Sequence, residues 1–267
     1  MNGLGGSELA VLALGAVLVG FAKTAIGGVG AISVALFATV LPARESSGAL
    51  LPLLIAGDLL AVSAYRRHAD WQALLRVFPS VAAGVLAGTV FVAQVDDTVM
   101  RRTIGATLLV VVAVHLWQRA KKKRRTGAGS RTGAEAAPPG NGAAAVVAGG
   151  GFGGAALFYG LLAGFTTMVA NAGGAVMALY FLAVGFPMMR FLGTAAWFFL
   201  IVNVFKVPFS AGLGLISVDS LELNAVLLPA VLLGALVGRA GVSRLDQARF
   251  EKLVLFFTVL SALNLVR

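Results

Sequence analysis

The sequence predicts an all-α polytopic membrane protein, and three observations carry that prediction. Hydrophobic residues make up 59% of the chain and charged residues 12%, whereas a soluble domain averages about 25% charged. Apolar runs of about 20 residues, enough to cross a bilayer as a helix, recur along the whole length of 267 residues. These runs are continuous rather than alternating, which argues against a transmembrane β-barrel.

The apolar segments fall into two groups on either side of a basic linker. They span 9–41, 48–65, 73–94, 99–118, 144–186, 190–211, 221–242 and 249–266. The linker, 119–143, is rich in Lys, Arg, Gly and Pro, a composition that cannot bury a core. We therefore expect a first transmembrane repeat at 1–118 and a second at 144–267, joined by a cytoplasmic linker.

The two halves also resemble each other in sequence. The matching residues are Gly20-Phe21 with Gly164-Phe165, Asp58 with Asn203, Gly84 with Gly234, and Gly88 with Gly238. Internal duplication of this kind is a common plan of secondary transporters, whose substrate binds near the repeat interface. The glycines spaced four apart predict helix faces that pack closely.

The length of the first apolar run predicts a break within it. A continuous helix over 9–41 would be about 50 Å long, against roughly 30 Å of hydrocarbon. If each long run crossed once, the Lys and Arg counts of the two sides would be 10 and 8. If each turns back at its glycines, as two half-helices or two short spans, the second half inverts and the counts become 14 inside and 4 outside. The positive-inside rule favours two inverted repeats, each a glycine-broken helix hairpin followed by three transmembrane helices.

Lys23 lies deep within the first long run, beside a glycine cluster. A lysine at that depth costs about 2.5–3.5 kcal/mol on insertion, and a broken helix is tolerated there only where it lines a cavity. An ammonium next to the backbone N–H groups of a helix break predicts an anion site. Two alternatives are that Lys23 reaches toward the membrane interface or pairs with Asp58 for structural reasons.

The equivalent stretch of the second half carries hydroxyl and amide donors instead of a lysine. We expect the two breaks to meet and to bind substrate through Lys23, Thr24, Gly27, Gly28, Gly30, Thr167, Asn171, Gly173 and Gly174. The alternative is that these hydroxyls and glycines merely permit close helix packing.

Three further polar residues lie within apolar segments, and we interpret them as coupling or charge-pair residues. Asp58 could accept a proton during transport or neutralise Lys23. Asn203 is its match in the second half. Lys206 lies one turn beyond Asn203 and could attract anions or serve only as a helix-end cation.

Several classes of function are disfavoured. The chain has no cysteine, and its two histidines lie near segment ends, so we expect no metal site. Neither a nucleotide-binding P-loop nor a nucleophile–base pair is visible, so we expect no enzyme activity, catalytic residue or cofactor. The formal charge is +10, but seven of the 21 basic residues fall within 119–131, which indicates membrane orientation rather than binding of nucleic acid.

Several stretches of the sequence together form a recognisable pattern, namely GFAKTAIGGVG at 20–30, LPAR at 41–44, LPLLIAGD at 51–58, YRRH at 65–68, FLGTAAWFF at 191–199, Asn203 and KVP at 206–208. Through these stretches the chain resembles the sulfite exporter TauE/SafE family over nearly its whole length apart from the linker. It implies a multi-pass permease of the cell inner membrane that moves sulfite, an organosulfonate or a related sulfur-containing anion.

We therefore expect a secondary transporter of a small oxyanion that works by alternating access, with a proton or cation as candidate coupling ion. An anion channel-like pore is the first alternative, and a membrane scaffold or enzyme is the second.

Overall fold

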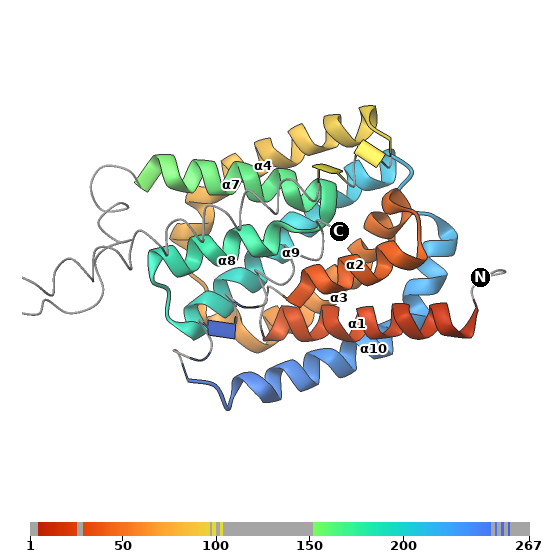
Figure 1. Cartoon of the computed structure of the whole chain (residues 1–267). Helices are drawn as coiled ribbons and strands as arrows, with labels where there is room; N and C mark the ends of the chain where they lie inside the picture. The colour runs from red at the N-terminus through yellow and green to blue at the C-terminus, as the bar shows by residue number, and fades with distance from the viewer. Residues whose placement is uncertain are drawn as a thin grey trace, which may run out of the picture.

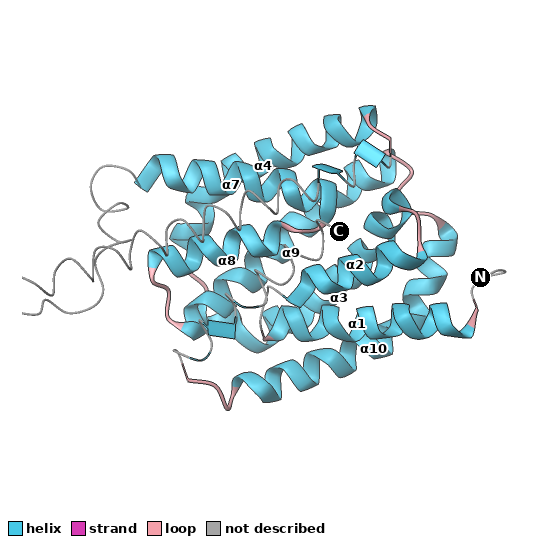
Figure 2. Ribbon diagram, viewed as in Figure 1, coloured by secondary structure: helices cyan, strands magenta, loops and turns pink. Residues whose placement is uncertain are grey.

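The described part of the chain is all helical (Figures 1 and 2). A computed structural model describes residues 5–25, 29–96, 98–99, 102–103, 152–246, 249, 252–253 and 256. Five of the helices within these residues are long and apolar enough to cross a membrane. The predicted class, an all-α membrane protein with several spans, is confirmed.

The first half opens with a helix hairpin. Helix α1 covers Gly6–Thr24, and α2 covers Gly30–Val40. Gly15 of α1 packs on Phe37 of α2, while Gly30 lies near Ala22, so the two helices run in opposite directions. Their lengths are about 28 Å and about 16 Å. The predicted break in 9–41 is present, and it joins a helix of nearly bilayer length to one of half that length.

Helices α3 and α4 complete the described first half. Helix α3 covers Ala43–Tyr65, a 3₁₀ turn follows at Arg66–His68, and α4 covers Trp71–Gln94. Asp70 caps α4 by accepting a hydrogen bond from the Ala73 amide.

The second half repeats this order of elements. Its helices are α7 (Phe152–Ala170), α8 (Gly173–Val184), α9 (Met188–Gly212) and α10 (Val218–Val242). Gly173 at the start of α8 packs on Ala163 and Thr167, so α8 returns along α7 as α2 returns along α1. Most of 99–118 and 249–266, the linker and 144–151 lie outside the described residues, so the third helix predicted for each half is untested.

Helices of one half pack along helices of the other (Figure 1). Helix α10 lies along α1, where a Cβ added at Gly234 would overlap the carbonyl of Val17. Helix α4 lies along α7, where a Cβ added at Gly84 would overlap the carbonyl of Leu161. The two contacts involve residues at equivalent positions of the two halves, so the glycine faces predicted from spacing serve the same purpose in both.

Helices α3 and α9 pack against each other in antiparallel orientation. Gly193, near the start of α9, packs on the backbone of Tyr65 at the end of α3 and of His68 in the 3₁₀ turn that follows. Gly48, near the start of α3, packs on the backbone of Leu215 just beyond α9. Polar side chains at the middle of α3 and α9 therefore face each other inside the molecule.

An ion pair closes one end of this α3–α9 contact. Arg190 pairs with Asp70, whose backbone amide donates to Thr194 Oγ1 at 2.9 Å. Burial raises the pKa of Asp70, but the hydrogen bonds from Arg190 and the Ala73 amide outweigh it and hold the pKa below its usual value. The ion pair therefore contributes stability at neutral pH that is lost as the pH falls through this lowered pKa.

Replacing Gly164 by alanine tests the close helix contacts. A Cβ at Gly164 of α7 would overlap the carbonyl of Val81 in α4, and such overpacking costs about 1–3 kcal/mol. We expect Gly164→Ala to lower the Tm in detergent clearly. Gly154→Ala in the same helix is the control, because a Cβ there meets nothing within 4 Å. Equal Tm values for the two variants would contradict this account of the packing.

Candidate functional site

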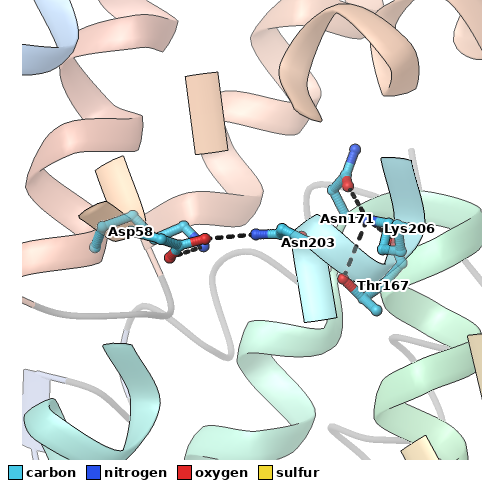
Figure 3. Close-up of polar contacts among 6 residues, drawn as sticks. Asp58, Thr167, Asn171, Asn203 and Lys206 are labelled. Carbon is cyan, nitrogen blue, oxygen red and sulfur yellow. Dashed lines mark hydrogen bonds and ion pairs between the residues drawn. The ribbon is translucent and has the colours of Figure 1, made fainter. Parts of the chain in front are cut away.

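A buried carboxylate lies between the two halves and is bound from both. Asp58 on α3 has a fully buried side chain. Lys23, in the last turn of α1, places its Nζ 2.7 Å from Asp58 Oδ1. Asn203 on α9 donates its Nδ2 to Asp58 Oδ2 at 2.6 Å (Figure 3). Asp58 is therefore held by an ammonium from its own half and by an amide from the other half.

The amide of Asn203 has its orientation fixed by this contact. Its nitrogen faces the carboxylate, because the reverse orientation would set two acceptor oxygens against each other. Its Oδ1 is buried and has no hydrogen-bond partner among the described residues. A buried acceptor without a partner is uncommon in folded proteins and marks this point as a polar site that the helices alone do not satisfy.

A second buried ammonium lies at the end of α7. Lys206 is 1% exposed, and its Nζ donates to the Thr167 carbonyl at 2.7 Å and to Asn171 Oδ1 at 2.6 Å. Thr167 Oγ1 lies 3.5 Å away. All of these neighbours are acceptors, which suits an ammonium with three N–H donors. The last turn of a helix has unpaired carbonyls and a partial negative charge, so it favours a cation there.

Asn171 shapes the break between α7 and α8. Its φ is 51°, in the left-handed region that asparagine tolerates better than most residues. Its Nδ2 donates to the carbonyl and hydroxyl of Ser47 on α3, at 3.0 Å and 3.2 Å. With Oδ1 accepting from Lys206, the whole side-chain amide is bound by protein. Asn171 thereby links the break in the second half to a helix of the first.

Thr24 ends α1 and anchors it to other helices. Its hydroxyl lies 3.1 Å from the Gly20 carbonyl and 2.9 Å from the Ala235 carbonyl of α10. Its own carbonyl accepts a hydrogen bond from the Tyr65 hydroxyl at 2.7 Å. The contacts of Thr24 therefore fit the alternative of helix packing.

A cavity of about 60 Å³ lies between the halves and contains the charged pair. Its volume suits several water molecules or one small ion. Residues of both halves line it, namely Lys23, Gly30, Asp58, Thr167, Asn171, Gly174, Asn203 and the aromatic rings of Phe181, Phe191 and Phe199. Lys23 Nζ also lies 4.5 Å from the centre of the Phe199 ring, a favourable cation–π distance.

The structure thus brings most of the predicted site residues together, but not all. Lys206 lies behind Thr167 and Asn171 rather than on the cavity wall, and Gly173 packs against α7. Gly27 and Gly28 lie outside the described residues. Lys23 lies at the carbonyl end of α1, so the nearest helix N-termini at the cavity are those of α2 and α8, which begin at Gly30 and Gly173. Neither helix has a side-chain cap on its first turn.

Two contributors were not predicted from the sequence. Ser47 binds Asn171, and Phe199 covers Lys23, yet neither residue stands out in its own segment. Their roles follow only from the three-dimensional structure, in which α3 and α9 pack against the helix breaks.

The family profile described as "Sulfite exporter TauE/SafE" matches residues 12–265. The chain belongs to this family. TauE/SafE proteins are membrane transporters rather than enzymes, and membership implies transport of a sulfite-type anion. Neither the curated proteins nor the solved structures contain a significant match.

A double-variant comparison tests the buried charge pair. Lys23→Met leaves the Asp58 carboxylate without its cation, and Asp58→Asn leaves the Lys23 ammonium without its carboxylate; breaking a buried pair in this way costs about 3–5 kcal/mol. We expect each single variant to lower the Tm in detergent. The combined variant Lys23→Met/Asp58→Asn removes both charges and should melt above either single one. Additive losses in the combined variant would show that the two groups are not coupled.

Proposed function

We propose that this chain is a secondary transporter that carries a small sulfur oxyanion across the cell membrane through the cavity between its halves. The observation that carries the proposal is the charge of this site. With Lys206 in its ammonium form, Lys23, Lys206 and Asp58 together carry one net positive charge in an apolar interior, beside the cavity of about 60 Å³. An uncompensated buried charge is costly, so an anion entering the cavity would be bound favourably.

In this proposal, both helix breaks contribute to substrate binding. Lys23 supplies the ammonium, and the first turns of α2 and α8 supply backbone N–H groups near Gly30 and Gly174, where the helix dipole is positive. Thr167 offers its hydroxyl from the cavity wall. Asn171 lines the cavity with its side-chain amide bound by Lys206 and Ser47, and Lys206 holds the end of α7 in place from behind.

We further propose that the halves are inverted repeats and that access alternates as they rock about the cavity. The relative directions of helices from the two halves support inverted repeats. Along α1 and α10 the contacting residues rise in number together, and the same holds along α4 and α7. In Figure 1, α1 begins at the right of the view, near the N-terminus, whereas α7 begins at the left. The two hairpins would then enter the membrane from opposite sides.

The cytoplasmic side follows from the basic residues. The α3–α4 turn carries Arg66 and Arg67, and it lies beside Arg190 at the start of α9. Arg44 lies at the opposite end of α3. By the positive-inside rule, we propose that the end with Arg66, Arg67 and Arg190 faces the cytoplasm, together with the basic linker.

Sulfite flux into proteoliposomes tests the proposed site. We expect the wild-type chain to carry sulfite and Lys23→Met/Asp58→Asn to lose most of that flux while remaining folded, because it keeps neither charge of the pair. Lys252→Met, which removes an exposed lysine, is the matched control and should keep wild-type flux. Wild-type flux in the folded double variant would show that the charge pair is only structural.

Accumulation against a gradient separates a coupled transporter from a channel-like pore. We propose that Asp58 carries the coupling, by taking up a proton or cation during the cycle. Asp58→Asn should therefore lose accumulation driven by an ion gradient while keeping downhill flux. Accumulation that survives in this variant would exclude Asp58 as the coupling residue, and a wild-type chain that never accumulates substrate would favour the pore.

A further inference from the structure

We propose that the site selects anions by their charge and accepts a monovalent oxyanion, such as hydrogen sulfite or a sulfonate, in preference to a divalent one such as sulfite or sulfate. This inference rests on the proposed anion transport and specifies its substrate class. It follows from the number of buried charges and from the way each is held.

The first step is that Lys206 has no carboxylate partner among the described residues. Its Nζ contacts the Thr167 carbonyl and the Asn171 amide oxygen, both neutral. Neutral oxygens stabilise an ammonium but do not cancel its charge. In its ammonium form, Lys206 therefore brings one positive charge that no carboxylate of the described residues pairs.

The second step is that Lys23 and Asp58 already neutralise each other. Their atoms lie 2.7 Å apart, and Asn203 holds the second carboxylate oxygen from the opposite helix. An arriving anion gains from the Lys23 ammonium but is repelled by the Asp58 carboxylate behind it. The pair orients and binds the ligand without adding net charge to the site.

The third step is that no other charge of the described residues is buried with these three. Asp58 and Lys206 are the charged side chains that the described helices bury most completely. Arg66 and Arg67 at one end of α3 and Glu45 at the other are exposed to the surroundings. Water and counter-ions screen such exposed charges far more than buried ones.

The site is then neutral with one monovalent anion and carries a net negative charge with a divalent one. An extra charge in an apolar interior costs several kcal/mol even after relaxation. The cavity of about 60 Å³ leaves little room for the waters that would solvate it. A divalent anion must therefore bind more weakly, or lose one charge by protonation before it enters.

Methanesulfonate and sulfate form a matched pair of probes, since both are tetrahedral sulfur anions and a methyl group replaces one charged oxygen. We would measure their binding to the full-length protein in detergent by calorimetry, with ionic strength held constant by a large organic anion. The wild-type chain should bind methanesulfonate at least about tenfold more tightly than sulfate, because one unpaired buried charge is worth more than that factor.

Three variants change the charge of the site in known steps. Asp58→Asn raises it by one and should shift the ratio of the two affinities about tenfold or more toward sulfate. Lys206→Met lowers it by one and should shift the ratio the other way, with weaker binding of both probes. Lys252→Met removes an exposed charge outside the site and should leave the ratio unchanged.

The outcomes separate this inference from the proposed function. A wild-type chain that binds neither probe nor sulfite would overturn the anion site itself. Binding of both probes with equal affinity, or with sulfate preferred, would keep the anion site and overturn the selection by charge. The selection by charge would also be overturned if the ratio of the two affinities stayed constant in Asp58→Asn and Lys206→Met. Partial loss of folded protein does not affect this test, because it compares the affinities of two probes for the same sample.

Discussion

The constraint on which the rest of the structure depends is the cost of keeping charges inside an apolar fold. Lys23, Asp58 and Lys206 are tolerated because each meets polar atoms at about 2.6–2.7 Å from a different helix. Those partners can be reached only if α1, α3, α7 and α9 converge within one side-chain length. The backbone contacts at glycines provide that convergence, since a methyl group at these positions would hold the helices apart.

The two halves carry different chemistry at positions that match in sequence. Asp58 on α3 corresponds to Asn203 on α9, so the second half offers an amide where the first offers a carboxylate. Lys206 corresponds to Ala61, a fully buried alanine, so its ammonium has no counterpart in the first half. Two identical carboxylates facing each other at this depth would repel, and the amide avoids that repulsion while still binding the carboxylate. The asymmetry therefore follows from placing two halves around one site.

The sequence predicted the features that depend on local cost and on length. A run of 33 residues is too long for one straight span, and a lysine beside glycines is too costly for a simple helix, so the break in 9–41 could be expected. The pairing of Lys23 with Asp58 was one stated alternative. The hydrogen-bond partner of each polar side chain could not be predicted in the same way. Thr24 and Asn171 bind Ala235 and Ser47, which lie in the opposite half and carry no signal of their own. The packing of the two halves determines such partners, and the sequence pattern of a single segment does not predict that packing.

The Asp58 carboxylate connects this packing to movement. One of its oxygens faces a residue of its own half, and the other is bound by Asn203 from the opposite half. If the halves rock against each other, as we propose, the bond across α3 and α9 must lengthen while the bond within the first half survives. The carboxylate would then lose a donor at the moment when water gains access to it, and a proton or cation is the natural replacement for that donor. In the proposed cycle, a buried carboxylate shared between the two halves would therefore link ion binding to the change of access without any additional gate.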